Sequence, residues 1–194
     1  LTYTASVDGN GSVSIDGSEL TIIPDVNFNG DILVEVSVSD GQVLDNTSFI
    51  LTVVPINDAP EIISEISIST DEDSSIEIIL DGIDIDGDVL TYLIDEESLN
   101  GEVVIIDNIA IFSPDLNYNG ITSFSYKAFD GELVSNSSAV EIIVTPVNDA
   151  PVLDAIADQE VDEDNTFTYS LSADDVDGDD LSYTVSIDGN GSVS

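Results

Sequence analysis

Aspartate is concentrated in one short stretch of this sequence. The stretch DGIDIDGDVLTY holds Asp81, Asp84, Asp86 and Asp88 within eight positions. The whole chain has 41 Asp and Glu residues against a single basic residue, Lys127, so its formal net charge is −40. Two like charges 4 Å apart repel by about 1 kcal/mol in bulk water and by about 4 kcal/mol at an effective dielectric constant of 20. Carboxylates that converge in the folded chain therefore need a cation from solution.

The side chains that are absent narrow the chemistry of such a site. The chain has no Cys and no His, which excludes thiolate and imidazole metal sites, Cys–His and Ser–His nucleophiles, and disulfides. Carboxylates, amides, hydroxyls and backbone carbonyls remain, and oxygen ligands suit hard cations, chiefly calcium or magnesium. Calcium accepts six to eight oxygens from such a mixture, so we expect Ca²⁺ to be the bound cation.

Composition also limits the partners. Hydrophobic residues make up 42% of the chain and lie in short alternating runs, so we expect folded cores in spite of the charge. The lack of a basic patch excludes nucleic acid, and an anionic membrane surface would repel the chain. No apolar run approaches the 18 to 20 residues that span a bilayer, so we expect no membrane insertion.

An internal repeat of about ninety residues organises the chain. INDAP at 56–60 recurs as VNDAP at 147–151, and PDVNFNG at 24–30 recurs as PDLNYNG at 114–120. The first fourteen residues nearly recur at 181–194. We interpret the chain as part of a longer tandem array: residues 1–55 are the C-terminal part of one repeat, residues 56–146 are a complete repeat, and residues 147–194 are the N-terminal part of a third.

The pattern within a repeat is that of β-strands. VEVSVSD at 34–40 alternates apolar and polar residues with period two, and SSIEIIL, GEVVII, IAIFSP, SFSYKAF and AVEIIVTPV are similar. Asp-Gly, Asn-Gly and Pro-Asp turns separate these runs. About seven short strands in ninety residues predict an all-β fold of tandem immunoglobulin-like β-sandwiches. An EF-hand is rejected for DIDGD, because the register puts Gly82 and Leu93 at ligand positions and the flanks are strand-like.

These motifs resemble the cadherin-like tandem repeats of large bacterial surface adhesins. VNDAP is similar to the Asp/Asn linker between cadherin domains, and DIDGDVLTY to the D-x-D segment of that family. DED at 71–73 lies where the family has a metal-binding Glu after the first strand. AFDGELVSNSS is similar to the segment before its last strand. The resemblance covers the whole chain.

Carried over residue by residue, the resemblance implies two interdomain calcium clusters. The ligands of the first would be Asn57, Asp58, Asp84, Asp86 and Asp130, and those of the second Glu72, Asn148, Asp149, Asp175 and Asp177. Asp25 and Asp115 lie near a D-x-E position of the family. Asn27 and Asn117 replace the Glu there.

Two alternatives to calcium binding stay open. The aspartates could lie in solvated turns, or the acidic surface could be a halophilic adaptation that keeps the protein in solution at high salt. General halophilic acidity explains the scarcity of Lys and Arg, but it does not explain why Asp recurs at the same phases of the repeat. The recurrence favours the metal.

The favoured function is a calcium-rigidified structural or extender module of a large secreted or cell-surface adhesin, an extracellular role in which each repeat contacts its neighbours. The alternative is an adhesive module that binds carbohydrate or another copy of itself when calcium is present. Glycoside hydrolysis needs two carboxylates about 5 to 9.5 Å apart across a substrate. Nothing in the pattern marks such a pair, so we expect no enzymatic activity. Because the two ends share a repeat phase, we also predict head-to-tail self-association into filaments. In a longer array, the neighbouring repeats would instead supply the complementary strands within one chain.

Overall fold

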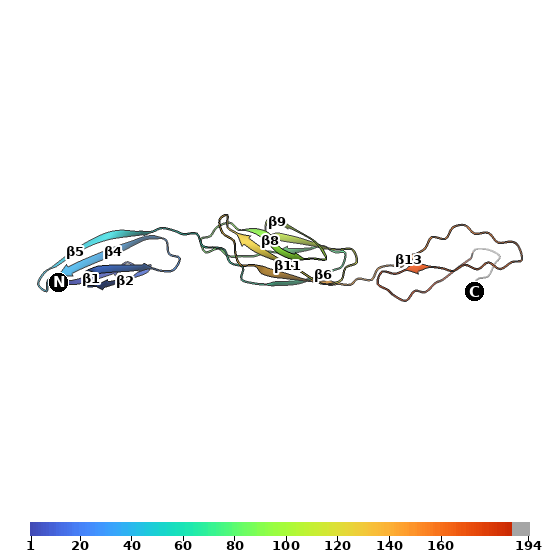
Figure 1. The fold of residues 1–194 in the computed structure, drawn as a ribbon, viewed down its shortest axis with the longest axis horizontal. Coiled ribbons are helices and arrows are strands. Elements are labelled where there is room, and N and C mark those ends of the chain that lie inside the picture. Colours follow the sequence, from blue (N-terminus) through green and yellow to red (C-terminus); the bar gives the residue numbers. More distant parts are fainter. Residues whose placement is uncertain (188–194) are drawn as a thin grey trace. The chain divides into compact units, whose positions relative to one another are not determined.

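The computed structural model describes residues 1–187 of the chain, apart from the side chains of residues 96–98. The described residues form β-strands joined by turns and loops, without an α-helix (Figure 1). Accordingly, this part of the chain contains no helix that could cross a membrane. The chain divides into two compact units. Unit 1 consists of Leu1–Ile63, Asp81–Leu93 and Lys127–Ser137, and unit 2 consists of Ser64–Leu80, Ile94–Tyr126 and the described part of Ser138–Ser194.

Unit 1 contains the first five strands. They are β1 (Thr2–Val7), β2 (Gly11–Asp16), β3 (Glu19–Pro24), β4 (Gly30–Ser39) and β5 (Leu44–Val53). Strands β1, β4 and β5 form an antiparallel sheet in that order, and β2 and β3 form a hairpin. Ile32 and Val34 on β4 are fully buried, so the apolar face of the larger sheet lies inside this unit.

Unit 2 is built on two larger sheets. Its strands are β6 (Ile66–Asp71), β7 (Ile76–Ile79), β8 (Thr91–Ser98), β9 (Gly101–Ile106), β10 (Ile109–Pro114), β11 (Gly120–Phe129), β12 (Ser138–Thr145), β13 (Val152–Leu153) and β14 (Ala173–Asp174); β8 begins and β11 ends in unit 1. The strand orders are β6-β12-β11-β8 and β7-β10-β9, and β13 pairs with β14. Strand β6 runs parallel to β12, and β7 runs antiparallel to β10.

Alternating burial builds the core of the sandwich. In β12 every second residue from Ser138 to Val144 is buried, and the residues between them are exposed. In β11 every second residue from Thr122 to Ala128 is buried. Successive side chains of a strand point to opposite faces of its sheet, so each strand presents one apolar row to the interior. The largest fully buried side chains of unit 2 are Phe112, Tyr126, Ile78, Leu80, Val140 and Ile142.

The strands expected from the period-two runs are present in residues 30–145, but the segment after β13 differs from the expectation. Residues 154–172 form no strand, and Phe167 and Tyr169 are 46% and 49% exposed. A strand is stable only when a neighbouring strand accepts and donates its backbone hydrogen bonds. The described part of unit 2 offers no such neighbour to this segment.

The burial pattern predicts how much the free energy of unfolding falls when a core side chain is truncated. Replacement of Phe112, which is fully buried on β10, by Ala should lower the free energy of unfolding by about 3 to 5 kcal/mol, because apolar burial is lost and a cavity remains. The matched control is Val104→Ala on the paired strand β9, where the side chain is 56% exposed and the change should be within about 1 kcal/mol. Urea unfolding followed by circular dichroism measures both. Equal effects of the two substitutions would contradict the assigned core.

Candidate metal centres

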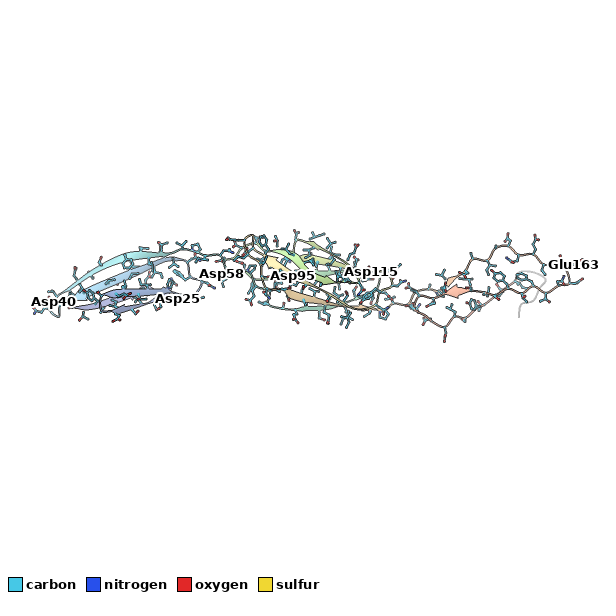
Figure 2. All side chains as sticks on the ribbon, viewed as in Figure 1. Asp25, Asp40, Asp58, Asp95, Asp115 and Glu163 are labelled. Atoms are coloured by element: carbon cyan, nitrogen blue, oxygen red, sulfur yellow. The ribbon has the colours of Figure 1, made fainter. Side chains whose placement is uncertain are left out.

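The first cluster of predicted ligands lies in unit 1. Asn57 and Asp58 follow β5, Asp84 and Asp86 lie in the loop before β8, and Asp130 follows β11; Figure 2 labels Asp58 in the segment after β5. Two backbone hydrogen bonds between Glu61 and Ile83, of 2.8 and 2.9 Å, hold that segment against the loop. Residues that are distant in sequence are thus brought together by a short ladder next to the cluster.

Hydrogen bonds connect the carboxylates of this cluster to its backbone. The Asp58 N–H donates to Asp86 Oδ2 at 2.8 Å, and the Asp86 N–H donates to Asp84 Oδ1 at 2.9 Å. The Asp88 N–H donates to the same Asp84 oxygen at 3.2 Å. The other oxygen, Asp84 Oδ2, is buried and has no hydrogen-bond partner. The backbone of the loop therefore fixes Asp84 Oδ1, whereas no hydrogen bond offsets the burial of Asp84 Oδ2.

Asp130 is held differently. Its Oδ1 accepts the N–H groups of Glu132 and Leu133, each at 2.6 Å, and its Oδ2 accepts Asn57 Nδ2 at 2.9 Å. These bonds stabilise the ionised carboxylate and so lower the pKa of Asp130 below its ordinary value of 3.8. The Leu133 N–H makes the largest contribution. Asp40, at the equivalent turn after β4, accepts Gln42 and Val43 N–H groups. Asp130 thus shapes a turn and orients the linker amide.

The second cluster lies in unit 2 and has the same internal bonds. The Asp149 N–H donates to Asp177 Oδ2 at 2.7 Å, and the Asp177 N–H donates to Asp175 Oδ1 at 3.1 Å. In each linker the Asn side chain donates to the carbonyl of the following Asp, at 2.7 Å from Asn148 and at 3.4 Å from Asn57. The arrangement recurs with the spacing of the sequence repeat, so each linker aspartate is tied in the same way to the loop that follows it.

A buried glutamate distinguishes the second cluster. Glu72 is only 3% exposed, at the end of β6. Its Oε1 accepts the Val147 N–H at 2.6 Å, and Asn119 Nδ2 donates to its Oε2 at 3.5 Å. A carboxylate oxygen of Glu72, one of Asp149 and one of Asp177 lie within 4.8 Å of one another. Of the three residues Glu72 is buried, Asp149 is half-buried and Asp177 is exposed. Burial of a carboxylate without an opposite charge is costly, and a cation beside these three oxygens would offset that cost.

Asp149 is the carboxyl of this cluster whose pKa is shifted. Its Oδ2 is buried and has no hydrogen-bond partner. Desolvation and the charges of Asp177, Asp73, Glu72 and Asp175 raise the pKa of Asp149 above its ordinary value of 3.8. Both causes disfavour the ionised form, and the opposite charge of a bound dication would favour it. The donor set, carboxylate and amide oxygens with a buried unused carboxylate oxygen, fits Ca²⁺.

The structure also places residues near the clusters that were not among the predicted ligands. Asp73 accepts the Asn117 N–H at 2.9 Å, and Asn119 contacts Glu72. Asn117 adopts a left-handed φ of +57°. Asn117 and Asp149 line one cavity. The recurrence of PDVNFNG and PDLNYNG was the sequence signal for this loop.

Comparison with known proteins places the fold in a class. Residues 57–143 match the family described as Bacterial Ig domain. Human protocadherin-24 EC1-2 has a TM-score of 0.52 at 18% identity, over 73% of this chain and 81% of that chain. Mouse protocadherin-24 EC1-3 has a TM-score of 0.50 at 20% identity, over 89% and 65% of the two chains. No curated protein sequence matches the chain.

The fold is therefore that of tandem immunoglobulin-like and cadherin-like β-sandwich repeats, as the sequence predicted. An endo-fucoidan hydrolase from glycoside hydrolase family 107 is also similar over 75% of this chain, with a TM-score of 0.37 and 17% identity. The chain spans about 23% of the length of that hydrolase.

The two shifted carboxyls predict opposite pH responses in metal-free protein. A raised pKa means that the contribution of Asp149 to stability is present below about 3.8 and is lost as the pH rises through the folded-state pKa. A lowered pKa means that the contribution of Asp130 is present above about 3.8 and is lost as the pH falls through the folded-state pKa. Asp149→Asn should thus stabilise the protein at pH 7, and Asp130→Asn should destabilise it.

Urea unfolding in EDTA at pH 7 and at pH 3 measures both effects. The two variants serve as controls for each other, since each removes one negative charge. Both differences from the unsubstituted protein should shrink at pH 3. Stabilisation by both substitutions at pH 7 would show that general charge repulsion, and not the local environment, sets the response.

Proposed function

We propose that this chain is a calcium-stiffened structural module of a large secreted or cell-surface adhesin. In this role the repeats act as an extender that holds a binding domain away from the cell. The immunoglobulin-like and cadherin-like fold supports a mechanical role, since tandem sandwiches transmit force through the linkers that join them. The proposal assigns no catalytic role to any residue.

The observation that carries the proposal is the recurrence of one acidic arrangement at both linkers. Asp58 and Asp149 each donate a backbone N–H to an aspartate of the following loop. Each cluster also contains a buried carboxylate oxygen without a partner, on Asp84 in one case and on Asp149 in the other. The two oxygens belong to different positions of the repeat, a loop aspartate in one cluster and the linker aspartate in the other. General surface acidity would expose its carboxylates to water, and it gives no reason for a buried, unpartnered oxygen in each cluster.

Calcium would change the mechanics of the linkers. In metal-free protein the carboxylates of a cluster repel each other, and this repulsion favours their separation. A bound Ca²⁺ would accept oxygens from the linker and from the loop together, and so would tie one to the other. Asn57, Asp58, Asp84 and Asp86 would hold it in unit 1, and Glu72, Asn148, Asp149, Asp175 and Asp177 in unit 2.

The proposed affinity would make calcium binding depend on whether the module is inside or outside the cell. Extracellular calcium modules bind with dissociation constants of about 0.1 to 1 mM. Such a site is filled in the extracellular medium and empty inside a cell. The array would then be flexible before secretion and stiff afterwards.

Thermal unfolding in a calcium titration tests the metal sites. Each filled site should stabilise the folded protein by about 2.7 kcal/mol at a calcium concentration one hundred times the dissociation constant, because calcium binds the folded state. Asp84→Asn with Asp86→Asn should remove the response of the first site. The matched control is Asp88→Asn, an exposed position that contributes a backbone N–H to the loop and should keep the full response.

Magnesium and sodium chloride at equal ionic strength are the solution controls. An equal rise of the unfolding midpoint in sodium chloride would overturn the calcium sites in favour of halophilic solvation. The fold would be unaffected by that result.

Small-angle X-ray scattering tests the mechanical step. We expect calcium to narrow the distribution of distances in solution and to increase the maximum dimension, because stiff linkers remove bent conformers. The Asp84→Asn, Asp86→Asn variant should show a smaller change than the Asp88→Asn control. A distribution that is already narrow in EDTA, and unchanged by calcium, would overturn the extender proposal even if calcium binds.

A further inference from the structure

The outer face of the β7-β10-β9 sheet carries a contiguous group of aliphatic side chains. All three strands lie in unit 2, well inside the chain. The outward residues of this sheet form three rows across the strands. In order along the strands, the rows are Ile79, Ile109 and Ile106, then Glu77, Ile111 and Val104, then Ser75, Ser113 and Glu102. The first two rows contain five aliphatic side chains, which we call the aliphatic face.

The side chains of the aliphatic face stay accessible. Ile79 is 70% exposed, and Val104 and Ile106 are each 56% exposed. Ile109 and Ile111, on the central strand β10, are half-buried among them. Residues of the core alternate with these positions along β9 and β10, so all five side chains point away from the interior of unit 2.

The outer face of the other sheet has a different composition. Its rows across β6, β12 and β11 are Ser67, Glu141 and Ser123, followed by Ser69, Ile143 and Ile121. Ser67 Oγ donates to Glu141 Oε1 at 3.3 Å, a contact between polar groups that water also reaches. One outer face of unit 2 is thus mainly polar, whereas the other is mainly aliphatic.

The hairpin of β2 and β3 in unit 1 shows that the fold does not require an aliphatic outer face. This hairpin has the register of β9 and β10, one repeat earlier in the sequence. At the places of Val104, Ile106, Ile109 and Ile111 it has Ser14, Asp16, Glu19 and Thr21. Among its outward residues only Ile23, at the place of Ser113, is apolar. An aliphatic group where the fold accepts polar residues indicates a contact surface.

Charge identifies what covers the aliphatic face. The five side chains offer neither a charge nor a hydrogen-bonding group, so they suit neither a carbohydrate nor an ionic partner. A basic partner would be drawn to the carboxylates elsewhere on a chain whose net charge is −40. A second copy of the chain is repelled by those carboxylates and can approach closely only where they are absent. The aliphatic face meets this condition, and two identical faces are complementary about a two-fold axis.

We propose that two copies of this chain associate side by side through the aliphatic face, with the two sheets packed antiparallel. The two-fold axis passes between the row of Ile109 and the row of Ile111. Ile109 then lies against the partner's Ile111, and Ile106 lies against the partner's Val104. Packed sheets are about 10 Å apart, and their side chains interdigitate. The contact involves no calcium, so it goes beyond the proposed function.

The positions of two glutamates favour the antiparallel arrangement. Glu102 lies in the third row, so the two copies of Glu102 are about six residues apart along the strands, or about 20 Å at 3.4 Å per residue. The Debye length is about 8 Å at physiological ionic strength, so salt screens their repulsion. Glu77 is exposed on β7, at the edge of the sheet, and stays in contact with water. A parallel arrangement would instead gather all four glutamates at one end of the interface.

The small size of the face makes a single contact weak. The sheet offers nine outward positions on three strands, compared with roughly 20 to 30 residues on each side of a standard interface. We therefore expect a dissociation constant on the order of 1 mM. Tethering raises effective concentrations into the millimolar range. Chains held next to each other would thus pair, whereas dilute chains would stay apart.

Light scattering over a concentration series up to about 1 mM, in EDTA, tests the association. The average mass should rise with concentration. The rise should begin at an about tenfold lower protein concentration when NaCl increases from about 0.05 to about 0.5 M, because salt screens the repulsion between two acidic chains. An average mass that stays that of the monomer at both salt concentrations would overturn the inference.

A pair of matched variants tests which face makes the contact. Val104→Ser with Ile111→Thr introduces the residues that unit 1 has at these positions. It should raise the concentration for half-association by about tenfold, a loss of about 1.4 kcal/mol. The control, Ile143→Ser with Ile121→Thr, removes two exposed aliphatic side chains from the other outer face and should leave the association unchanged. Equal effects of the two pairs would overturn the assignment to this face.

Chemical cross-linking tests the geometry without removing the aliphatic group. The chain has no Cys, so Val104→Cys places a single thiol in the aliphatic face. A bismaleimide about 10 Å long, the separation of packed sheets, should join two such chains into a dimer. Ser69→Cys, exposed on the outer face of the other sheet, is the matched control and should remain monomeric. Equal yields from both positions, or no dimer from Val104→Cys, would contradict the proposed packing.

These outcomes separate the side-by-side contact from the calcium sites. A protein that calcium stabilises but that stays monomeric would overturn this inference and leave the proposed function intact. Cross-linking at Val104→Cys in a protein that does not respond to calcium would support the inference and overturn the calcium proposal. Head-to-tail association would raise the average mass without cross-linking at Val104→Cys, and that result would also overturn the side-by-side contact.

Discussion

Repulsion among carboxylates is the constraint on which the rest of this structure depends. The chain has a formal net charge of −40 and one basic residue, so it cannot neutralise its acidic side chains with its own ion pairs. Each carboxylate must therefore point into water, accept backbone hydrogen bonds or share an external cation. The fold uses the first two means for many of its acids. The two linker clusters are where they are insufficient, because buried carboxylate oxygens remain without partners.

The β-sandwich suits a chain with this charge. Strand alternation lets an acidic residue sit beside a buried apolar one without entering the core, as Glu141 does between Val140 and Ile142 on β12. Turn aspartates such as Asp40 and Asp130 gain stability from backbone N–H groups, which lower their pKa values. Glu72 is the exception. It is buried at the end of β6 and contacts a backbone N–H and an amide.

Strand pairing is the second constraint, and it acts over long sequence distances. Strand β6 finds its partner in β12, more than seventy residues away, and this pairing buries Val140 and Ile142. The same pairing positions a residue of the proposed calcium site, because the turn that follows β6 carries Glu72.

The sequence by itself determined the all-β fold, the strand positions of the middle repeat and the pairs of aspartates that recur in phase with it. These features are local, because neighbouring residues alone form the period-two alternation and the Asp-Gly turns. Only the tertiary structure decided which oxygens are bonded. It engaged both oxygens of Asp130, left Asp84 Oδ2 and Asp149 Oδ2 buried without partners, and brought Asn119 to Glu72. Residues 154–172 include the repeat equivalents of β6 and β7 but form no strand. The physical reason is common to these cases: burial and hydrogen bonding are set by contacts between distant segments, and local sequence patterns do not specify those contacts.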